Sequence, residues 1–502
     1  MPVRNQTLTH KEIISLYNHY FAIFVLCVGA CIGSFINVVI YRWSRGMSVR
    51  KPVWSFCPAC KKSIAWYDNI PVISYLLLQG RCRKCRVPIS LHYPFVELAT
   101  AFIILLAYDA MFVARQRIGI GAWLLPGDWV MMVTHWVLFG GLIVLAVMDL
   151  EVYLVDIRVT WIISAVALVG HALWVPSCQG WIRPGPYQAA ISLAALIGLV
   201  VGSWLFLRRR AGPVPDSDNQ IPPVDSEELT GRESPQVPVE QEIRAPSRWG
   251  WILVIIPLAL LVGYLTAILI AGAQEPLTYF WPVTGYSADA LYQQADRIDD
   301  GLVRVGVGLA IVFIALTLAA GNPHAQADSD IVETIAAEAP DSRRNALWEL
   351  KLLTPAIFLS LVVAALLITQ PGIKDEVQHW LSWEPIGRFQ PLWGLATAVS
   401  GWIIGGAIGW LARILFTLLF RKEAFGMGDV HILAAAGAVA GWPVAFLGFF
   451  LAAPLTLAAM LVIQMRRQSR AVPYGPWLGL GFLLAGLLQD RILLFLGVRS
   501  LL

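Results

Sequence analysis

Charged residues are scarce in this sequence. Only 14% of its 502 residues are Asp, Glu, Lys or Arg, whereas a soluble domain carries about a quarter. The net charge of +4 is small and spread along the chain, so we expect no nucleic acid as a partner. Hydrophobic residues make up 57%, and the mean hydropathy is +0.65. This composition excludes an ordinary soluble protein and indicates a chain that lies in a lipid bilayer.

Uninterrupted apolar runs recur along the chain, and each is long enough to cross a bilayer as a helix, which takes about 20 residues. The runs are continuous and do not alternate, which favours helices over barrel strands. We therefore predict an all-α polytopic membrane protein with about twelve transmembrane helices. Three of them fall within 430–497, and the others lie at 20–41, 93–114, 128–148, 158–176, 187–207, 249–272, 303–321, 352–370 and 392–419.

Lys and Arg residues gather in the segment 42–92, called here the cysteine loop. Because basic loops of membrane proteins face the cytosol, we place this segment on the cytosolic side of a bacterial inner membrane. Counting spans onward from it places the later basic clusters on the same side. Residues 211–248 are rich in Pro, Asp, Glu and Ser, and this composition predicts a disordered linker. Residues 322–348 are acidic and rich in Ala, and we expect a short surface helix there.

We expect six parts in the chain. The segment before the first apolar run is polar, and the run itself lacks a signal-peptide cleavage pattern, so we expect it to stay as an uncleaved span. The parts are a polar segment (1–19), a first transmembrane helix (20–41), the cysteine loop (42–92), a membrane core with a first candidate Asp (93–176), an insertion with about four extra spans (177–391) and a second core segment (392–502).

Four of the seven cysteines form two Cys-x-x-Cys pairs in the cysteine loop. These are Cys57, Cys60, Cys82 and Cys85, and 21 residues separate the two pairs. Such a spacing can place four thiolates tetrahedrally around a zinc ion, and the surrounding basic residues favour the thiolate form. A reducing cytosol disfavours the competing disulfides. We predict a structural zinc site with no open position for water; the alternative is four reduced thiols without a metal.

Two acidic residues at predicted span ends are candidates for catalysis. Asp149 lies in AVMDLEVYLVD at the end of one span. Asp429 lies in the Gly426-Met427-Gly428-Asp429 stretch and is followed by an Ala-rich apolar run. In the simplest interpretation Asp149 is a solvated helix end and Asp429 is an N-cap that satisfies free amides. Glycines on either side of Met427 would also permit a close approach by another segment.

Taken together, the two aspartates predict more than either alone. Peptide hydrolysis by carboxyl groups needs one ionised group to activate water and one protonated group to polarise the carbonyl. Two carboxyl groups that share a site have separated pKa values and supply both forms. Asp149 and Asp429 are 280 residues apart, yet both fall at cytosolic span ends. An even number of predicted spans lies between them, so the chain returns to the same face of the membrane and the two residues can share a site.

Several segments resemble one family, the bacterial type IV prepilin leader peptidases. They are GSFINVVIYR (33–42), WYDNIPVISYLLLQGRCRKC (66–85), PISLHYPFVELATA (88–101), MDLEVYLVD (148–156), KEAFGMGD (422–429) and VPYGPWLGLG (472–481). The resemblance covers roughly residues 20–176 and 392–497.

The resemblance implies an aspartyl endopeptidase of the Gly-x-Gly-Asp type with Asp149 and Asp429 as the catalytic pair. Its substrates would be prepilins or the pseudopilins of type II secretion, cut at the cytosolic membrane face, and a pilus or secretion assembly would be a partner. It also implies N-methylation of the new N-terminus with S-adenosylmethionine, a function associated with the cysteine loop and the segment around Glu97. Gly426 and Gly428 would support the second aspartate.

The sequence departs from the family pattern at two points. The first aspartate motif ends in Leu154-Val155-Asp156, where a proline is usual before the last Asp. The insertion at 177–391 separates the two aspartates much further than is usual. We interpret its additional spans as helices packed around the core; substrate docking, a secretion-complex contact and dimerisation are alternatives.

Three other interpretations are open. A zinc-containing membrane scaffold without activity would not need both aspartates. A multi-span transporter tends to place charges at mid-membrane in symmetric halves, a pattern that this sequence does not have. A presenilin-like protease shares the Gly-x-Gly-Asp signature but lacks the cysteine loop.

Overall fold

The computed structural model describes ten stretches of the chain. They are residues 10–114, 125–152, 155–174, 186–210, 252–274, 300–320, 325–382, 390–421, 425–465 and 473–497. The linker predicted at 211–248 lies outside these residues.

Helices form almost all of the regular structure in the described part of the chain, where only two isolated β-bridges occur. The helices are α1 (His10–Trp43), η1 (Trp66–Asn69), α2 (Ile73–Leu77), α3 (His92–Tyr108), η2 (Asp109–Val113), α4 (Leu125–Val152), α5 (Ile157–Leu173), α6 (Pro186–Arg210), α8 (Ile252–Gln274), α10 (Asp300–Ala320), α11 (Ala325–Thr369), α12 (Pro371–Ser382), α13 (Gln390–Phe420), α14 (Met427–Ala440), α15 (Trp442–Met465) and α16 (Gly475–Phe495).

The described residues contain eight helices that are long and apolar enough to cross a membrane. Shorter apolar helices lie at Ile157–Leu173, Ile255–Leu269, Met427–Ala440 and Gly475–Gln489. These twelve helices coincide with the twelve predicted spans, so the expectation of an all-α polytopic membrane protein is confirmed. The expected short surface helix at 322–348 is instead the first part of α11, which continues without a break into the next span.

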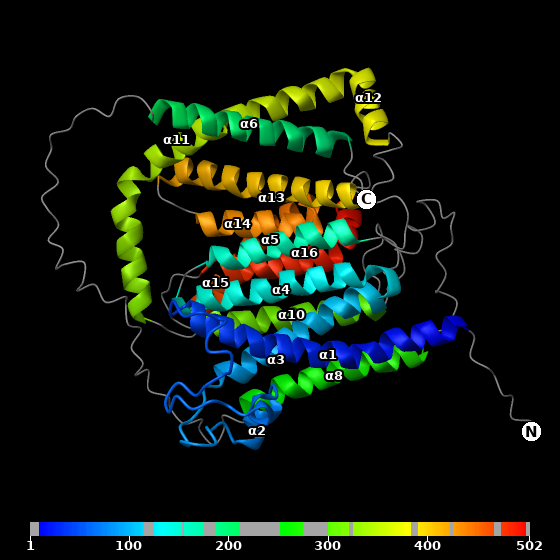
Figure 1. The fold of residues 1–502 in the computed structure, drawn as a ribbon, viewed down its shortest axis with the longest axis vertical. Helices are drawn as coiled ribbons and strands as arrows, with labels where there is room; N and C mark the ends of the chain where they lie inside the picture. Colours follow the sequence, from blue (N-terminus) through cyan, green and yellow to red (C-terminus); the bar gives the residue numbers. More distant parts are fainter. Residues whose placement is uncertain are drawn as a thin grey trace, which may run out of the picture.

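Most of the long helices run side by side in one bundle (Figure 1). The cysteine loop and α2 lie at one end of this bundle, called here the loop end, next to α1 and α3. A polar contact shows the direction of α4, because His92 Nδ1 at the start of α3 lies 3.4 Å from Glu151 Oε1 near the end of α4. The last turn of α4 therefore also lies at the loop end.

The insertion divides into two groups on opposite sides of the bundle (Figure 1). Helices α8 and α10 lie beside α1 and α3, and their residues Leu261, Tyr264, Val305 and Leu309 belong to the same buried core as residues of α3, α4 and α16. Helices α6 and α11 pack on each other and on α13, and within the described residues they add nothing to that core. Half of the insertion is therefore part of the central core.

Candidate functional site

Asp149 lies near the end of α4 and is almost fully buried, with 8% of its surface exposed. Its Oδ2 accepts a hydrogen bond of 2.9 Å from the backbone N–H of Gly475. Gly475 is the first residue of α16, and the first amides of a helix have no partner within the helix. The carboxyl group thus sits at a helix N-terminus, where the helix dipole favours negative charge. The alternative interpretation of Asp149 as a solvated helix end is therefore wrong, because this carboxyl group is buried and hydrogen-bonded.

Gly475 has no room for a side chain. A Cβ atom built on it would lie 2.5 Å from Oδ2 of Asp149, well inside van der Waals contact. The VPYGP segment therefore brings a bare backbone amide against the carboxyl group. Although Gly475 stands in a segment quoted for its family resemblance, the sequence alone did not identify it as a partner of Asp149.

Asp429 lies at the start of α14 and is also nearly buried, with 9% of its surface exposed. The helix begins at Met427 with Gly426 as its N-cap. The N-cap interpretation of Asp429 is therefore wrong, since Asp429 is the third residue of the helix. From this position its carboxyl group interacts with the backbone of Gly426, as the acidic residue of a capping box does with the N-cap residue.

The fold brings the two aspartates together. Asp149 interacts electrostatically with Asp429, although 280 residues separate them in sequence. Tyr474, next to the amide that holds Asp149, also interacts electrostatically with Asp429, and its hydroxyl donates a hydrogen bond of 3.3 Å to the carbonyl oxygen of Phe449. The two carboxyl groups, called here the carboxyl pair, are thus both buried at the loop end and lie close enough to interact electrostatically.

The two glycines of the Gly-x-Gly-Asp stretch have different surroundings. A Cβ atom on Gly428 would lie 2.6 Å from Cβ of Val155 and 2.9 Å from its Cγ1. A Cβ atom on Gly426 would meet nothing closer than Oδ2 of Asp429 at 3.6 Å. Gly428 is therefore the position at which α14 touches the segment that follows α4. Val155 stands where the family pattern has proline, and it makes this contact.

Glu97 is placed by the structure at the junction of α1, α3 and the cysteine loop. Its Oε2 accepts a hydrogen bond of 2.7 Å from the N–H of Val72, and its carboxyl group also bonds to Ser34 of α1. Val72 has φ of 59°, a conformation that is unusual for a β-branched residue. Glu97 thus secures a strained turn of the cysteine loop.

Arg42 and Asn37 of the GSFINVVIYR segment have structural roles that sequence reasoning missed. Arg42 is buried, and its guanidinium donates hydrogen bonds to four carbonyl oxygens of the cysteine loop. These are at Ser48 (3.4 Å), Val49 (2.8 Å), Pro52 (2.7 Å) and Trp54 (3.3 Å). Asn37 Nδ2 donates to the carbonyl oxygen of Tyr93 at 2.9 Å. A buried Arg at the end of an otherwise apolar helix was the available signal, because such a charge needs partners.

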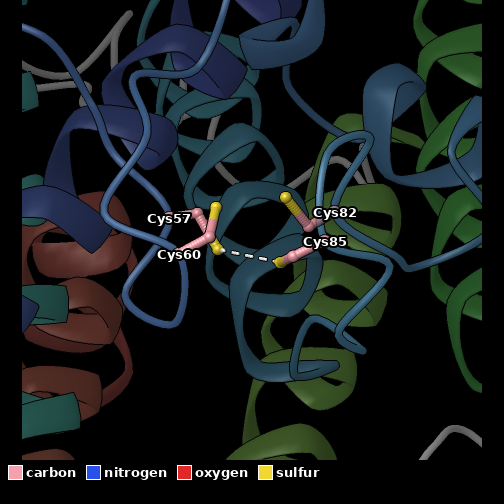
Figure 2. Close-up of side chains that lie close together, drawn as sticks. All are labelled: Cys57, Cys60, Cys82 and Cys85. Atoms are coloured by element: carbon pink, nitrogen blue, oxygen red, sulfur yellow. Dashed lines mark hydrogen bonds between the residues drawn. The ribbon is translucent and has the colours of Figure 1, made fainter.

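The four predicted cysteines form one cluster in the cysteine loop. Their sulfur atoms all lie within 4.8 Å of one another. Two turns supply one Cys-x-x-Cys pair each, and the sulfur atoms point into the space between the turns (Figure 2). The Sγ atoms of Cys57 and Cys85 are 3.8 Å apart.

The two turns repeat the same backbone pattern at an offset of 25 residues. Cys57 N–H donates to the carbonyl oxygen of Lys62 at 3.0 Å, and Cys82 N–H donates to that of Val87 at 2.9 Å. The residue after each pair has positive φ, 57° at Lys61 and 59° at Arg86. The bridges Phe56 with Ser63 and Arg81 with Pro88 close the two turns. The repeat is not evident in the sequence, because outside the cysteines the side chains of the two turns differ.

The cluster has the donor set and spacing that a tetrahedral metal ion needs. With metal–sulfur bonds of about 2.3 Å, tetrahedral sulfur ligands lie about 3.8 Å apart. Burial raises the pKa of the Cys57 thiol to about 11. Burial also opposes ionisation of Cys82, but the N–H groups of Cys85 and Lys84 and the neighbouring thiols lower its pKa to about 7. The donor set and its spacing therefore fit a metal ion.

Comparisons with known proteins agree on one family. Residues 27–111 match the family described as the bacterial peptidase A24 N-terminal domain. A prepilin leader peptidase/N-methyltransferase of Myxococcus xanthus is 33% identical over 204 residues, which are 41% of this chain and 55% of that protein. Proteins of the same name from Klebsiella pneumoniae and Vibrio cholerae are 42% identical over 102 residues and 47% identical over 79 residues.

The matched stretches span about half of these relatives or less. They cover 19% of this chain and 44% of the Klebsiella protein, and 14% of this chain and 31% of the Vibrio protein. No solved structure matches the chain. Residues 27–111 are therefore similar to the bacterial peptidase A24 N-terminal domain, and parts of the chain are similar to prepilin leader peptidase/N-methyltransferases.

Proposed function

We propose that this chain is a membrane aspartyl endopeptidase that removes the leader peptide of type IV prepilins or pseudopilins. The observation that supports the proposal is the carboxyl pair, because Asp149 and Asp429 are both buried and interact electrostatically although they come from distant parts of the sequence. The names of the relatives supply the substrate class.

The chemistry follows from the two carboxyl groups. One, in its ionised form, takes a proton from a water molecule as the oxygen of that water attacks the scissile carbonyl carbon. The other, in its protonated form, donates its proton toward the carbonyl oxygen. Collapse of the tetrahedral intermediate breaks the C–N bond and passes a proton to the leaving amine. General acid–base steps of this kind contribute about 10²- to 10⁴-fold each.

We place the reaction at the cytosolic face of a bacterial inner membrane. The basic residues of the cysteine loop favour this orientation, and the carboxyl pair lies at the same end of the bundle. A substrate that crosses the membrane with a cytosolic leader would meet the pair where the leader joins the apolar segment. A pilus or type II secretion assembly would receive the product.

The cysteine loop completes the proposal. Cys57, Cys60, Cys82 and Cys85 would hold a zinc ion, which would fix the two turns relative to each other. Because all four ligands come from the protein, the ion would have a structural role. The names of the relatives extend the proposal to N-methylation of the new N-terminus with S-adenosylmethionine.

The test is cleavage of a prepilin by the purified full-length protein in lipid nanodiscs, with mass spectrometry of the new N-terminus. We expect Asp149→Asn and Asp429→Asn each to lower kcat by about 10²- to 10⁴-fold. A further gain of one methyl group with S-adenosylmethionine would report the second activity.

Asp128→Asn is the matched control. Asp128 is a buried aspartate of the same helix α4 and accepts a hydrogen bond from Trp174 Nε1 at 2.8 Å, but it lies at the opposite end of that helix. We expect this variant to be less stable and still active. Cleavage that survives both substitutions in the carboxyl pair would refute the aspartyl mechanism. A folded wild-type protein that cuts no prepilin would favour the scaffold interpretation.

A further inference from the structure

We propose that α10, a helix of the insertion, positions the carboxyl pair, and that Phe313 is the residue through which it acts. The expected change in kcat rests on the proposed function, whereas the expected change in the packing of α16 rests on the fold alone. It assigns a role to a part of the chain that we first expected to be only an accessory to the core.

A buried ion pair docks α10 on the core. Asp109, in η2 at the end of α3, is fully buried. Arg304 of α10 makes two hydrogen bonds to this carboxylate: Nε donates to Oδ2 at 2.7 Å, and Nη2 donates to Oδ1 at 2.7 Å. Tyr264 of α8 donates its hydroxyl to Oδ2 of the same aspartate at 2.8 Å. Bidentate, charge-assisted bonds of this kind fix geometry as well as adding energy, so α10 has a defined register against α3.

Apolar packing continues this contact along α10. Val305, Leu309 and Val312 are buried in the same core as Leu106 of α3 and Leu480 of α16. One face of α10 is thus held by the core over several turns. The opposite face carries exposed apolar residues, including Ile314, which is 57% exposed. The buried face therefore carries the structural connection.

Phe313 connects α10 to the helix turn that binds one carboxyl group of the pair. Its ring centroid lies 5.8 Å from that of Trp477, and Trp477 is fully buried. Trp477 lies in the first turn of α16, two residues after Gly475, whose N–H binds Asp149. Because a helix turn moves nearly as a unit, a shift of Trp477 also shifts that amide. Phe313 therefore holds the helix N-terminus that orients one carboxyl group of the pair.

Phe313 is half-buried, and truncating it would remove its packing against Trp477, so that the first turn of α16 could shift toward the vacated space. A displacement of about 1 Å at a reacting group can cost about 10²-fold in rate. The change lies away from any substrate contact. We therefore expect Phe313→Ala to lower kcat at least about tenfold with little change in KM.

The experiment compares three variants of the full-length protein in nanodiscs. Phe313→Ala removes the packing against Trp477, Phe313→Leu restores most of it, and Ile314→Ala is the matched control on the exposed face. We expect kcat to fall in the first, recover largely in the second and stay unchanged in the third. Amide hydrogen exchange of residues 473–479, read by mass spectrometry, should rise in Phe313→Ala alone.

Either readout can overturn the proposal. Unchanged exchange at the start of α16 in Phe313→Ala would show that Phe313 does not hold that turn, whatever the activity of the protein. An equal loss of kcat in Ile314→Ala would indicate general destabilisation. A wild-type protein that cuts no prepilin would count against the proposed function, whereas the exchange measurement would still decide the positioning role.

Discussion

A methyl group added at Gly428 should impair the carboxyl pair, whereas the same group at Gly426 should not. A Cβ atom on Gly428 would lie 2.6 Å from Cβ of Val155. Cβ is attached to the backbone, so no rotamer of Val155 relieves the overlap. Either the start of α14 or the segment after α4 must move. The first movement displaces Asp429, which is the next residue, and the second displaces the chain that leads from Asp149.

The expected size follows from the cost of overpacking. Extra methyl groups in a packed site cost about 1–3 kcal/mol, and each 1.36 kcal/mol corresponds to tenfold in rate. If the strain is relieved by moving the carboxyl pair, Gly428→Ala should lower kcat about 10- to 100-fold. At Gly426 the nearest atom to a new Cβ lies at 3.6 Å, which is ordinary contact, and its φ of −72° suits any residue. Gly426→Ala should therefore retain activity.

Two double variants make the test specific. The Val155→Ala/Gly428→Ala variant keeps the clashing Cβ of residue 155 and should stay impaired. The Val155→Gly/Gly428→Ala variant removes that atom and should recover most of the lost rate. The assay is prepilin cleavage in nanodiscs, with thermal unfolding as a measure of folding. Wild-type kcat in Gly428→Ala, or equal recovery in both double variants, would refute the steric reasoning.

Three further predictions concern other contacts. In Gly475→Ala the new Cβ would lie 2.5 Å from Asp149 Oδ2. We expect kcat to fall at least tenfold, about the effect of losing one well-placed hydrogen-bond donor. Prepilin cleavage at the wild-type rate would contradict this. Arg42→Gln should remove the guanidinium that donates to four carbonyl oxygens of the cysteine loop, and a hydrogen bond to a charged group contributes about 1.5–3 kcal/mol. Limited proteolysis should therefore cut that loop faster than in Arg45→Gln, an exposed neighbour. Metal removal by a chelator should increase amide hydrogen exchange in the two cysteine turns. Exchange in the turns of α14 and α16 that hold the carboxyl pair should not change. If the chelator does not change exchange in the cysteine turns, no metal organises the loop.

The sequence by itself determined the features that depend on local composition and spacing. Continuous apolar runs predicted the twelve helices, since a bilayer requires apolar side chains over a fixed length. The two Cys-x-x-Cys pairs predicted the four-cysteine cluster, because that spacing is short enough for a single turn to bring both thiols of a pair together. The two aspartates were singled out by their motifs, and the parity of the spans permitted them to meet.

Only the tertiary structure decided which groups surround those residues. The amide of Gly475 is 326 residues from the carboxyl group that it binds, and no local pattern encodes such a contact. The same holds for Val155 against Gly428 and for Arg304 against Asp109, each a fit between segments that are far apart in the chain. The insertion reads as four ordinary apolar spans in sequence, but α10 reaches the core because a buried charge pair and packed side chains hold it there. Local propensity identifies helices, whereas the complementarity of their buried faces decides which of them support the site.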